Sequence, residues 1–356
     1  MIKIYYPFLQ LLACIVNHMP VDWRMFKGFT PQNWEQFYRL AQKQGVVAIL
    51  FEVLREIPQE MAPPRTIMLK WIAQALSIEE QMHKKEAIAS ELAERLAARG
   101  IRTMVLKGLA YASYYPNPYH RESGDLDCYL MGKKAEGDQA VVAMGGMMEE
   151  AGYKHSHLRY KGLTIENHQF LTSFDNTKLG IRTERLLQGL IAESSRPIGN
   201  TRLLTPSSDF TALFLIKHAQ RHFIKEGIRI RHLLDWAFFL RAEVDRVNWP
   251  RIISLMEECK LLRFAQVLTT LCCEQLGMKV SLPALQGMTG LSDVVLKDLL
   301  ADHPNPYHEN LRQKIGRLLR RLRRMWQFRS LADESYLRLV WNSCAFNSYW
   351  RRNPKL

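Results

Sequence analysis

The sequence predicts an α+β protein in which a small mixed sheet has helices before and after it along the chain. The first hundred residues carry apolar side chains at the spacing of helices. Short β-prone runs follow up to about residue 174, and helical spacing returns from Asp209 onward. With 356 residues the chain is long enough for two or three domains. We expect an N-terminal helical segment over 1–95, an α/β core over 96–203 and a C-terminal helical domain over 204–356.

The N-terminal segment begins with a short apolar stretch that predicts a helix over Phe8–Asn17. Its Leu-Leu-Ala-Cys14 loosely resembles a lipoprotein cleavage box. Pro7 and Gln10 interrupt an apolar run that is already short for a signal peptide, which favours a helix packed on the core.

Further helices are expected before the core. An apolar stripe predicts a helix over Gln32–Leu54, and prolines separate it from a helix that begins near Thr66. A long helix is predicted from about Ile78 to Arg99, where Gly100 provides a C-cap glycine.

The core is expected to contain a strand, a glycine turn, a short helix, a second strand, a helix and one or two further strands. These elements correspond in order to Ile101–Leu106, Lys107-Gly108, a helix through Tyr115, Leu126–Met131, Lys134–Ala151 and Tyr153–Phe174.

The C-terminal domain is expected to be a helical bundle. Asp209 in Pro-Ser-Ser-Asp is a candidate N-cap for its first helix. The predicted helices are 210–224, 228–242, 248–261, 263–276, 292–301, 309–328 and 333–347.

Composition limits the class of protein. A formal net charge of +14 makes nucleotides, nucleic acid or membrane surfaces plausible partners, although a basic proteome explains the charge equally well. The cysteines have neither Cys-x-x-Cys nor zinc-ligand spacing, which fits a reducing cytoplasm. No segment is long and apolar enough to span a bilayer. The six cysteines are Cys14, Cys128, Cys259, Cys272, Cys273 and Cys344.

Two aspartates beside an apolar β-prone run are the main candidates for chemistry. Asp125 and Asp127 alternate with Leu126, so on a strand both carboxylates project to the same face. Two carboxylates placed in this way can share Mg²⁺ ions, which assist phosphoryl transfer. The alternative is that they cap a turn after Ser123-Gly124 and that the strand begins at Cys128.

An ordered set of short motifs resembles the nucleotidyltransferase superfamily to which DNA polymerase beta belongs, and in particular its bacterial branch of uncharacterised nucleotidyltransferases. The motifs are Leu106-Lys-Gly108, Arg121-x-x-x-Asp125-Leu-Asp127 and Ile165-Glu-Asn-His168. The resemblance runs over most of the chain. It includes Trp34 to Leu54, Leu204-Thr-Pro206, His218-Ala-Gln-Arg-His222 and Arg231-His-Leu-Leu-Asp-Trp236.

The resemblance implies that Asp125 and Asp127 bind Mg²⁺, in a two-metal site completed by Glu166 as third ligand or general base. It also implies that Gly108 opens a short helix whose amides face the nucleotide phosphates. Two departures stand out: Leu109 replaces the usual second glycine or serine at the turn, and the third acid is Glu166 rather than the commoner aspartate.

Two basic residues flank the aspartates and are suitable counter-charges for a triphosphate. They are Lys107 and Arg121. Each also has an ordinary structural interpretation, such as a solvated lysine at a strand end. His168 shares a face with Glu166 and either orients it or is a surface histidine.

The expected reaction is metal-dependent transfer of a nucleoside monophosphate from an NTP, such as ATP, to an acceptor hydroxyl with release of pyrophosphate. The acceptor is left open between RNA, a protein side chain and a small molecule. A nucleotide- or RNA-binding module that has lost turnover is the alternative, and Leu109 is the feature that favours it.

Two histidines in the helical domain have zinc-ligand spacing. His218 and His222 lie one turn apart, but no glutamate follows His218, so the metalloprotease motif is absent. A structural role is favoured, with one histidine packing against Asp235 or Trp236. We expect a hydrogen-bond network of His222, Arg231 and Asp235 that joins the helical domain to the nucleotide site.

The helix expected over 311–326 is basic and amphipathic, with seven basic residues and no acid. Its apolar stripe favours packing on the domain, with the arginines in water. Contact with RNA phosphates is a second interpretation and an anionic membrane surface a third.

Overall fold

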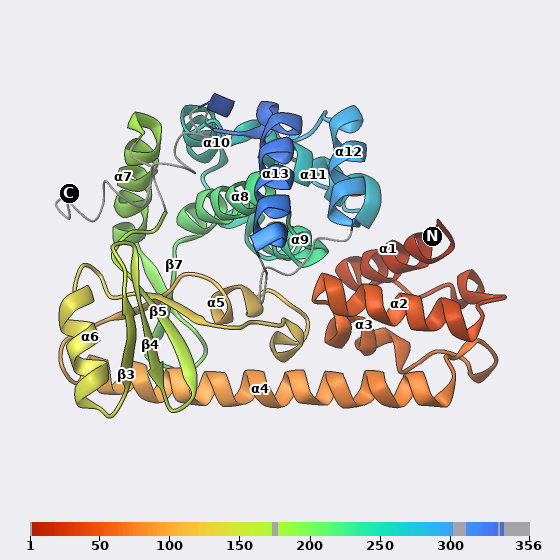
Figure 1. The fold of residues 1–356 in the computed structure, drawn as a ribbon, viewed down its shortest axis with the longest axis horizontal. Helices are drawn as coiled ribbons and strands as arrows, with labels where there is room; N and C mark the ends of the chain where they lie inside the picture. The colour runs from red at the N-terminus through yellow and green to blue at the C-terminus, as the bar shows by residue number, and fades with distance from the viewer. Residues whose placement is uncertain (1, 173–176, 302–310, 334, 338–356) are drawn as a thin grey trace.

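The computed structural model describes residues 2–172, 177–301, 311–333 and 335–337. Figure 1 shows the long helix α4 (Arg65–Ala97) running beneath the molecule. The sheet lies over one end of α4, the N-terminal helices lie over the other end, and the C-terminal helices lie above both. This arrangement confirms the predicted α+β class, whereas the domain boundaries at 95 and 203 stay predictions.

The boundaries of the N-terminal helices differ from the predicted ones. The helix expected over 32–54 divides in two because Gly45 takes a left-handed conformation with φ of 67° and ends the first part. The helices expected near 66 and over 78–99 form one helix, α4, since no glycine or proline interrupts its sequence. The helices before α4 are α1 (Ile2–Asn17), α2 (Pro31–Gln44) and α3 (Val47–Leu54).

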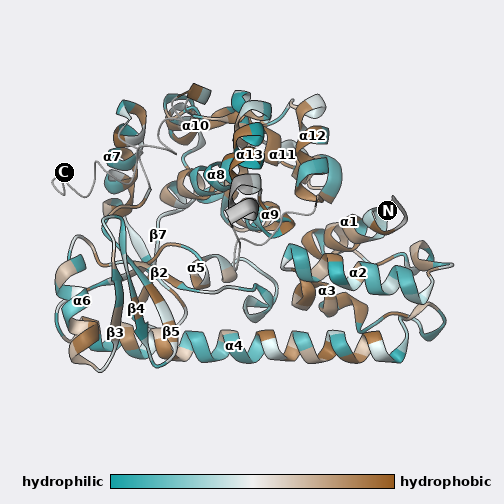
Figure 2. Cartoon of the chain, viewed as in Figure 1, coloured by the Kyte–Doolittle hydropathy of each residue, from teal (hydrophilic) through white to brown (hydrophobic). Residues whose placement is uncertain are grey.

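Helix α4 has apolar residues recurring along its length between hydrophilic ones, as Figure 2 shows. Its buried residues include Trp71 and Leu96, toward its two ends. One helix therefore contributes core residues both to the N-terminal segment and to the α/β unit.

The sheet has seven strands in the order β3-β4-β5-β2-β1-β7-β6. At its centre β2 pairs with β5 in parallel and with β1 antiparallel. The sequence analysis did not predict β6, β7 or helix α7 (Lys178–Glu193). The strands are β1 (Thr103–Val105), β2 (Leu126–Tyr129), β3 (Met147–Ala151), β4 (His155–Tyr160), β5 (Leu163–His168), β6 (Ser195–Pro197) and β7 (Leu203–Pro206).

The prediction of a helix up to Ala151 is wrong. Helix α6 (Lys134–Ala143) ends before Gly145, which adopts a positive φ of 90°. The chain then turns through Gly146 into strand β3 at the edge of the sheet. Glycines are poor helix formers, and here they begin a turn instead.

The C-terminal helices follow the predicted order and begin with α8, capped by Ser207 rather than Asp209. The helix predicted over 333–347 lies largely outside the described residues. None of the helices that the structure describes is long and apolar enough to cross a membrane. The helices are α8 (Ser208–Lys225), α9 (Ile230–Glu243), α10 (Trp249–Glu258), α11 (Leu262–Leu276), α12 (Thr289–Leu299) and α13 (Leu311–Gln327).

The basic helix α13 packs only part of its apolar stripe. Met325 is buried, and Arg324 pairs with Asp298. Leu319 and Trp326 remain exposed, at 61% and 55%. The side chains of residues 311–315 and 317 lie outside the described part, so the basic face is defined here only from residue 318 onward.

Candidate active site

The pairing of two central strands brings the candidate carboxylates together. β2 and β5 run parallel in a register that places Asp127 beside Glu166. Neighbours in register point to the same face of a sheet, although they lie far apart in the chain. The Asp127 side chain is buried, and its Oδ1 lies 2.9 Å from Lys107 Nζ and 3.2 Å from His168 Nε2.

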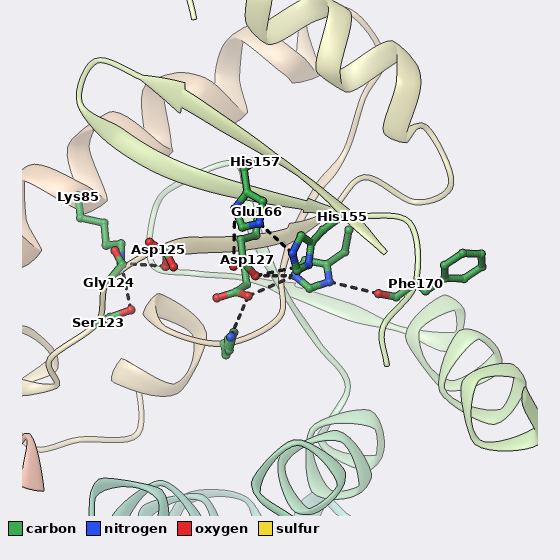
Figure 3. Close-up of polar contacts among 11 residues, drawn as sticks. Lys85, Ser123, Gly124, Asp125, Asp127, His155, His157, Glu166 and Phe170 are labelled. Atoms are coloured by element: carbon green, nitrogen blue, oxygen red, sulfur yellow. Dashed lines mark hydrogen bonds and ion pairs between the residues drawn. The ribbon is translucent and has the colours of Figure 1, made fainter. Parts of the chain in front are cut away.

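Asp125 joins this pair from the loop in front of β2. The strand begins at Leu126, so the alternative in which it begins at Cys128 is wrong. Asp125 is exposed, and Figure 3 shows it beside Asp127 and Glu166. Partial burial raises the pKa of Asp125, and the negative charges of Glu166 and Asp127 raise it further. Three carboxylates therefore converge at one point of the sheet.

A buried lysine on α4 fixes the loop that carries the aspartates. Lys85 Nζ donates to Ser123 Oγ at 3.0 Å, to the Asp125 carbonyl at 2.9 Å and to the Gly124 carbonyl. Burial lowers the pKa of Lys85 to about 8, although the charges of Asp127 and Asp125 oppose this. Lys85 therefore holds this loop in place, a role that its position in the sequence did not indicate.

The glycine turn lies against the same loop. Gly108 caps the short helix α5 (Leu109–Ala112) with φ of 65°, a conformation that favours glycine. A Cβ added at Gly108 would lie 2.7 Å from Ser123 Oγ, so glycine is also needed for close approach. Leu109 is buried. The hydroxyl nearest to Gly108 thus comes from Ser123, and not from the residue after the glycine.

Arg121 takes part in a buried ion pair. Its Nε and Nη2 donate to the two carboxylate oxygens of Asp235 at 2.7 and 2.8 Å, while Nη1 lies 3.4 Å from the Gly108 carbonyl. Tyr115 also donates to Asp235, at 2.7 Å. Burial would raise the pKa of Asp235, but the charge of Arg121 and its hydrogen bonds hold it below the usual value.

The predicted network around Asp235 has different members. Asp235 bonds to Arg121 and Tyr115, while Arg231 Nη1 donates to the Glu122 carbonyl at 2.8 Å. His222 Nδ1 instead lies 3.8 Å from Glu226 on its own helix. The link between helix α9 and the aspartate-bearing loop therefore exists, but it runs through Arg121 and Arg231.

A cavity of about 200 Å³ opens beside the carboxylates. Five of the six predicted site residues line it, and Glu166 approaches them through its pairing with Asp127. Further lining residues come from helices α8 and α9. The five are Lys107, Gly108, Arg121, Asp125 and Asp127.

Three histidines lie close to Glu166. His155, Glu166 and His168 form a group of close ligand-type atoms, and Figure 3 shows His157 beside them. Burial lowers the pKa of His155 to about 4. Of these three histidines only His168 was among the candidates from the sequence, although His155 and His157 stand two apart in a run predicted to be a strand.

Comparison with known proteins agrees with this geometry. The sequence model of a family described as uncharacterised nucleotidyltransferase matches residues 30–277, more than half of the chain. That range contains all three carboxylates, the glycine turn and the buried ion pair. No curated protein and no solved structure gives a match. The chain therefore belongs to this nucleotidyltransferase family and is a transferase whose general activity is nucleotidyl transfer.

Proposed function

We propose that the protein transfers a nucleoside monophosphate from an NTP to an acceptor hydroxyl, with divalent metal as cofactor and pyrophosphate as second product. The observation that carries this proposal is the convergence of Asp125, Asp127 and Glu166 beside a cavity lined by Lys107.

The donor set suits a hard divalent cation. Burial raises the pKa of Asp125 and the charges of Glu166 and Asp127 raise it further, and a bound cation would relieve the repulsion among the three carboxylates. Mg²⁺ prefers oxygen ligands and usually binds through one or two carboxylates together with substrate phosphates. Asp125, Asp127 and Glu166 would hold it. When bound, the metal neutralises charge that develops on the phosphate oxygens.

The residues around the cavity can place a triphosphate. Lys107 Nζ reaches the cavity from the end of β1 and can exchange its contact with Asp127 for one with a phosphate. Ser123 offers a hydroxyl at the glycine turn, where Leu109 provides none. Arg121 lines the cavity while Asp235 holds its guanidinium in place, so it would support the turn and add positive charge beside the phosphates.

The bond changes of the proposed step balance without any further reagent. The acceptor oxygen bonds to the α-phosphorus as the bond from that phosphorus to the bridging oxygen breaks, and pyrophosphate leaves with that oxygen. Glu166 accepts the proton of the acceptor hydroxyl. Positioning and charge neutralisation supply most of the rate enhancement in reactions of this type.

The acceptor would be selected by surfaces outside the group of three carboxylates. RNA, a protein side chain and a small molecule all offer a suitable hydroxyl. Exposed Arg320 and Arg323 on α13 support contact with a phosphate backbone.

The described cysteines are all free thiols, which supports a reducing compartment such as the cytoplasm.

A binding module without turnover is the second candidate. It is favoured because buried Leu109 follows the single Gly108, so the turn lacks the second glycine or serine that could contact a phosphate. Turnover separates the two functions.

The test uses NTPs radiolabelled at either the α- or the γ-phosphate, with Mg²⁺ and fractionated cell extract. We expect label to enter one fraction from the α-phosphate alone. Glu166→Gln should reduce this labelling by about 100-fold or more, whereas Glu149→Gln, an exposed change on the same sheet, should not. Binding of NTP without labelling of any fraction would favour the module.

A further inference from the structure

Four potential metal ligands lie on one face of the hairpin formed by β4 and β5. The antiparallel register pairs His155 with His168 and His157 with Glu166. Within each strand the two residues stand two apart, so all four side chains share a face. The hairpin therefore presents three imidazoles and one carboxylate at its end near residue 155 (Figure 3).

The orientation of His168 is fixed by a backbone carbonyl. Its Nδ1 lies 3.2 Å from the Phe170 carbonyl oxygen, which can only accept, so Nδ1 carries a proton. In the neutral ring the lone pair is then on Nε2, which faces Glu166 Oε2 at 3.4 Å and Asp127 Oδ1 at 3.2 Å. Metal-binding histidines commonly have this arrangement, with the second nitrogen bonded to a carbonyl.

His155 has a buried nitrogen without a hydrogen bond. Its Nε2 lies 3.1 Å from His157 Nε2, so the two rings share a hydrogen bond. Its Nδ1 has no hydrogen-bond partner in the described part of the chain and lies 3.6 Å from Glu166 Oε2, beyond hydrogen-bond range. A buried polar atom of this kind costs free energy unless a ligand satisfies it.

The spacing of these atoms suits a tetrahedral metal. Bonds of about 2.0–2.1 Å from zinc to nitrogen or oxygen place neighbouring ligands roughly 3.4 Å apart in a tetrahedron. Glu166 Oε2 lies 3.4 Å from one imidazole nitrogen and 3.6 Å from the other. Imidazole nitrogen favours zinc and other first-row transition ions over Mg²⁺.

We infer that His155 Nδ1, Glu166 Oε2 and His168 Nε2 form a site for Zn²⁺ or a similar transition ion. Three protein ligands leave one position open for water or a substrate oxygen. His157 holds the ring of His155 through its other nitrogen. The site shares Glu166 with the proposed nucleotidyl-transfer group, but neither Asp125 nor Asp127 is one of its ligands, so its metal binding can be tested separately.

The test is a titration of the full-length protein, stripped of metal by a chelator, with Co²⁺ as a coloured probe. We expect one equivalent to give the visible absorption of a low-symmetry cobalt site. Zn²⁺ should displace it, and millimolar Mg²⁺ should not. His155→Gln and His168→Gln should each weaken Co²⁺ binding by at least about 100-fold, and His157→Gln by about 10-fold.

The control is His222→Gln, a change at a half-exposed histidine on α8, which should leave Co²⁺ binding unchanged. Circular dichroism melting of each variant shows whether it folds, and either ligand variant suffices if the other does not. Asp125→Asn should abolish nucleotidyl transfer and still bind Co²⁺, which separates this site from the proposed function. Absence of Co²⁺ binding to the wild type, or binding that survives both ligand variants, would overturn the inference.

Discussion

Two groups of charged residues, joined by the segment 121–127, differ in how their charges are balanced. In the first, Arg121 and Asp235 are buried together and share two short hydrogen bonds, and Tyr115 adds a third bond to Asp235. In the second, three carboxylates converge: Lys107 and His168 pair with Asp127, while burial and the charges of Glu166 and Asp127 raise the pKa of Asp125. In the first group the charges are paired without any ligand, and the pairing stabilises the fold. The second carries negative charges that a bound cation would offset.

The largest expected effect is a loss of folding stability when the ion pair of Arg121 and Asp235 is broken. Asp235→Ala leaves the buried guanidinium of Arg121 without its partner, which typically costs about 3–5 kcal/mol of folding free energy. Urea unfolding followed by circular dichroism measures the loss, and Asp245→Ala at an exposed position is the control. Mg²⁺ affinity of the folded variant should change by less than about threefold. A variant that keeps wild-type stability but loses Mg²⁺ binding would contradict the structural role of Asp235.

The next largest effect is a loss of transfer activity when one of the three carboxylates is removed. Asp127→Asn removes one carboxylate without changing its size, and the rate of label transfer should fall by about 100- to 1,000-fold. Stability should fall less than in Asp235→Ala, because the main cation left without its partner, Lys107, is partly exposed, whereas Arg121 is buried. Asp245→Asn serves as the matched control. Wild-type transfer by Asp127→Asn would remove Asp127 from the catalytic group.

A smaller effect concerns the lysine that holds the aspartate loop. Lys85→Met leaves the carbonyls of Gly124 and Asp125 without their donor, which costs about 1–3 kcal/mol. A looser loop should weaken binding of an NTP with Mg²⁺ by about tenfold, measured by isothermal titration calorimetry. Lys84→Met, at the exposed neighbouring position, should change neither quantity. Equal effects of the two substitutions would show that Lys85 acts only through its charge.

The smallest effect is a dependence of stability on pH. The folded pKa of Asp235 lies below its usual value, so its pairing stabilises the protein above the unfolded pKa of about 4. That contribution is lost as pH falls through the folded pKa. The difference in unfolding free energy between the wild type and Asp235→Asn should be constant above about pH 5 and shrink below about pH 4. A difference that grows on acidification would reverse the assigned sign.

The sequence predicted the fold class and the convergence of the carboxylates, because both depend on local periods and on the order of motifs. Asp127 lies on the predicted strand and Asp125 directly before it, and Glu166 lies on a later strand, as the resemblance implied. The sequence did not predict that Gly145 and Gly146 end α6 early, although paired glycines disfavour a helix.

Long-range contacts account for what the sequence could not predict. The partner of Arg121 lies 114 residues away on α9, so its loop position alone did not indicate a buried ion pair. Lys85 stands among charged residues on the polar side of a helix pattern, and only the packing of the loop on α4 buries it. The pairing of His155 with His168 likewise depends on the hairpin register.

A crystal structure with Mg²⁺ and a non-hydrolysable NTP analogue would test the central claim most directly. We predict metal density bounded by Asp125, Asp127 and Glu166, with the triphosphate in the cavity beside Lys107. Nucleotide bound elsewhere on the chain, with these carboxylates contacting only protein atoms, would contradict it.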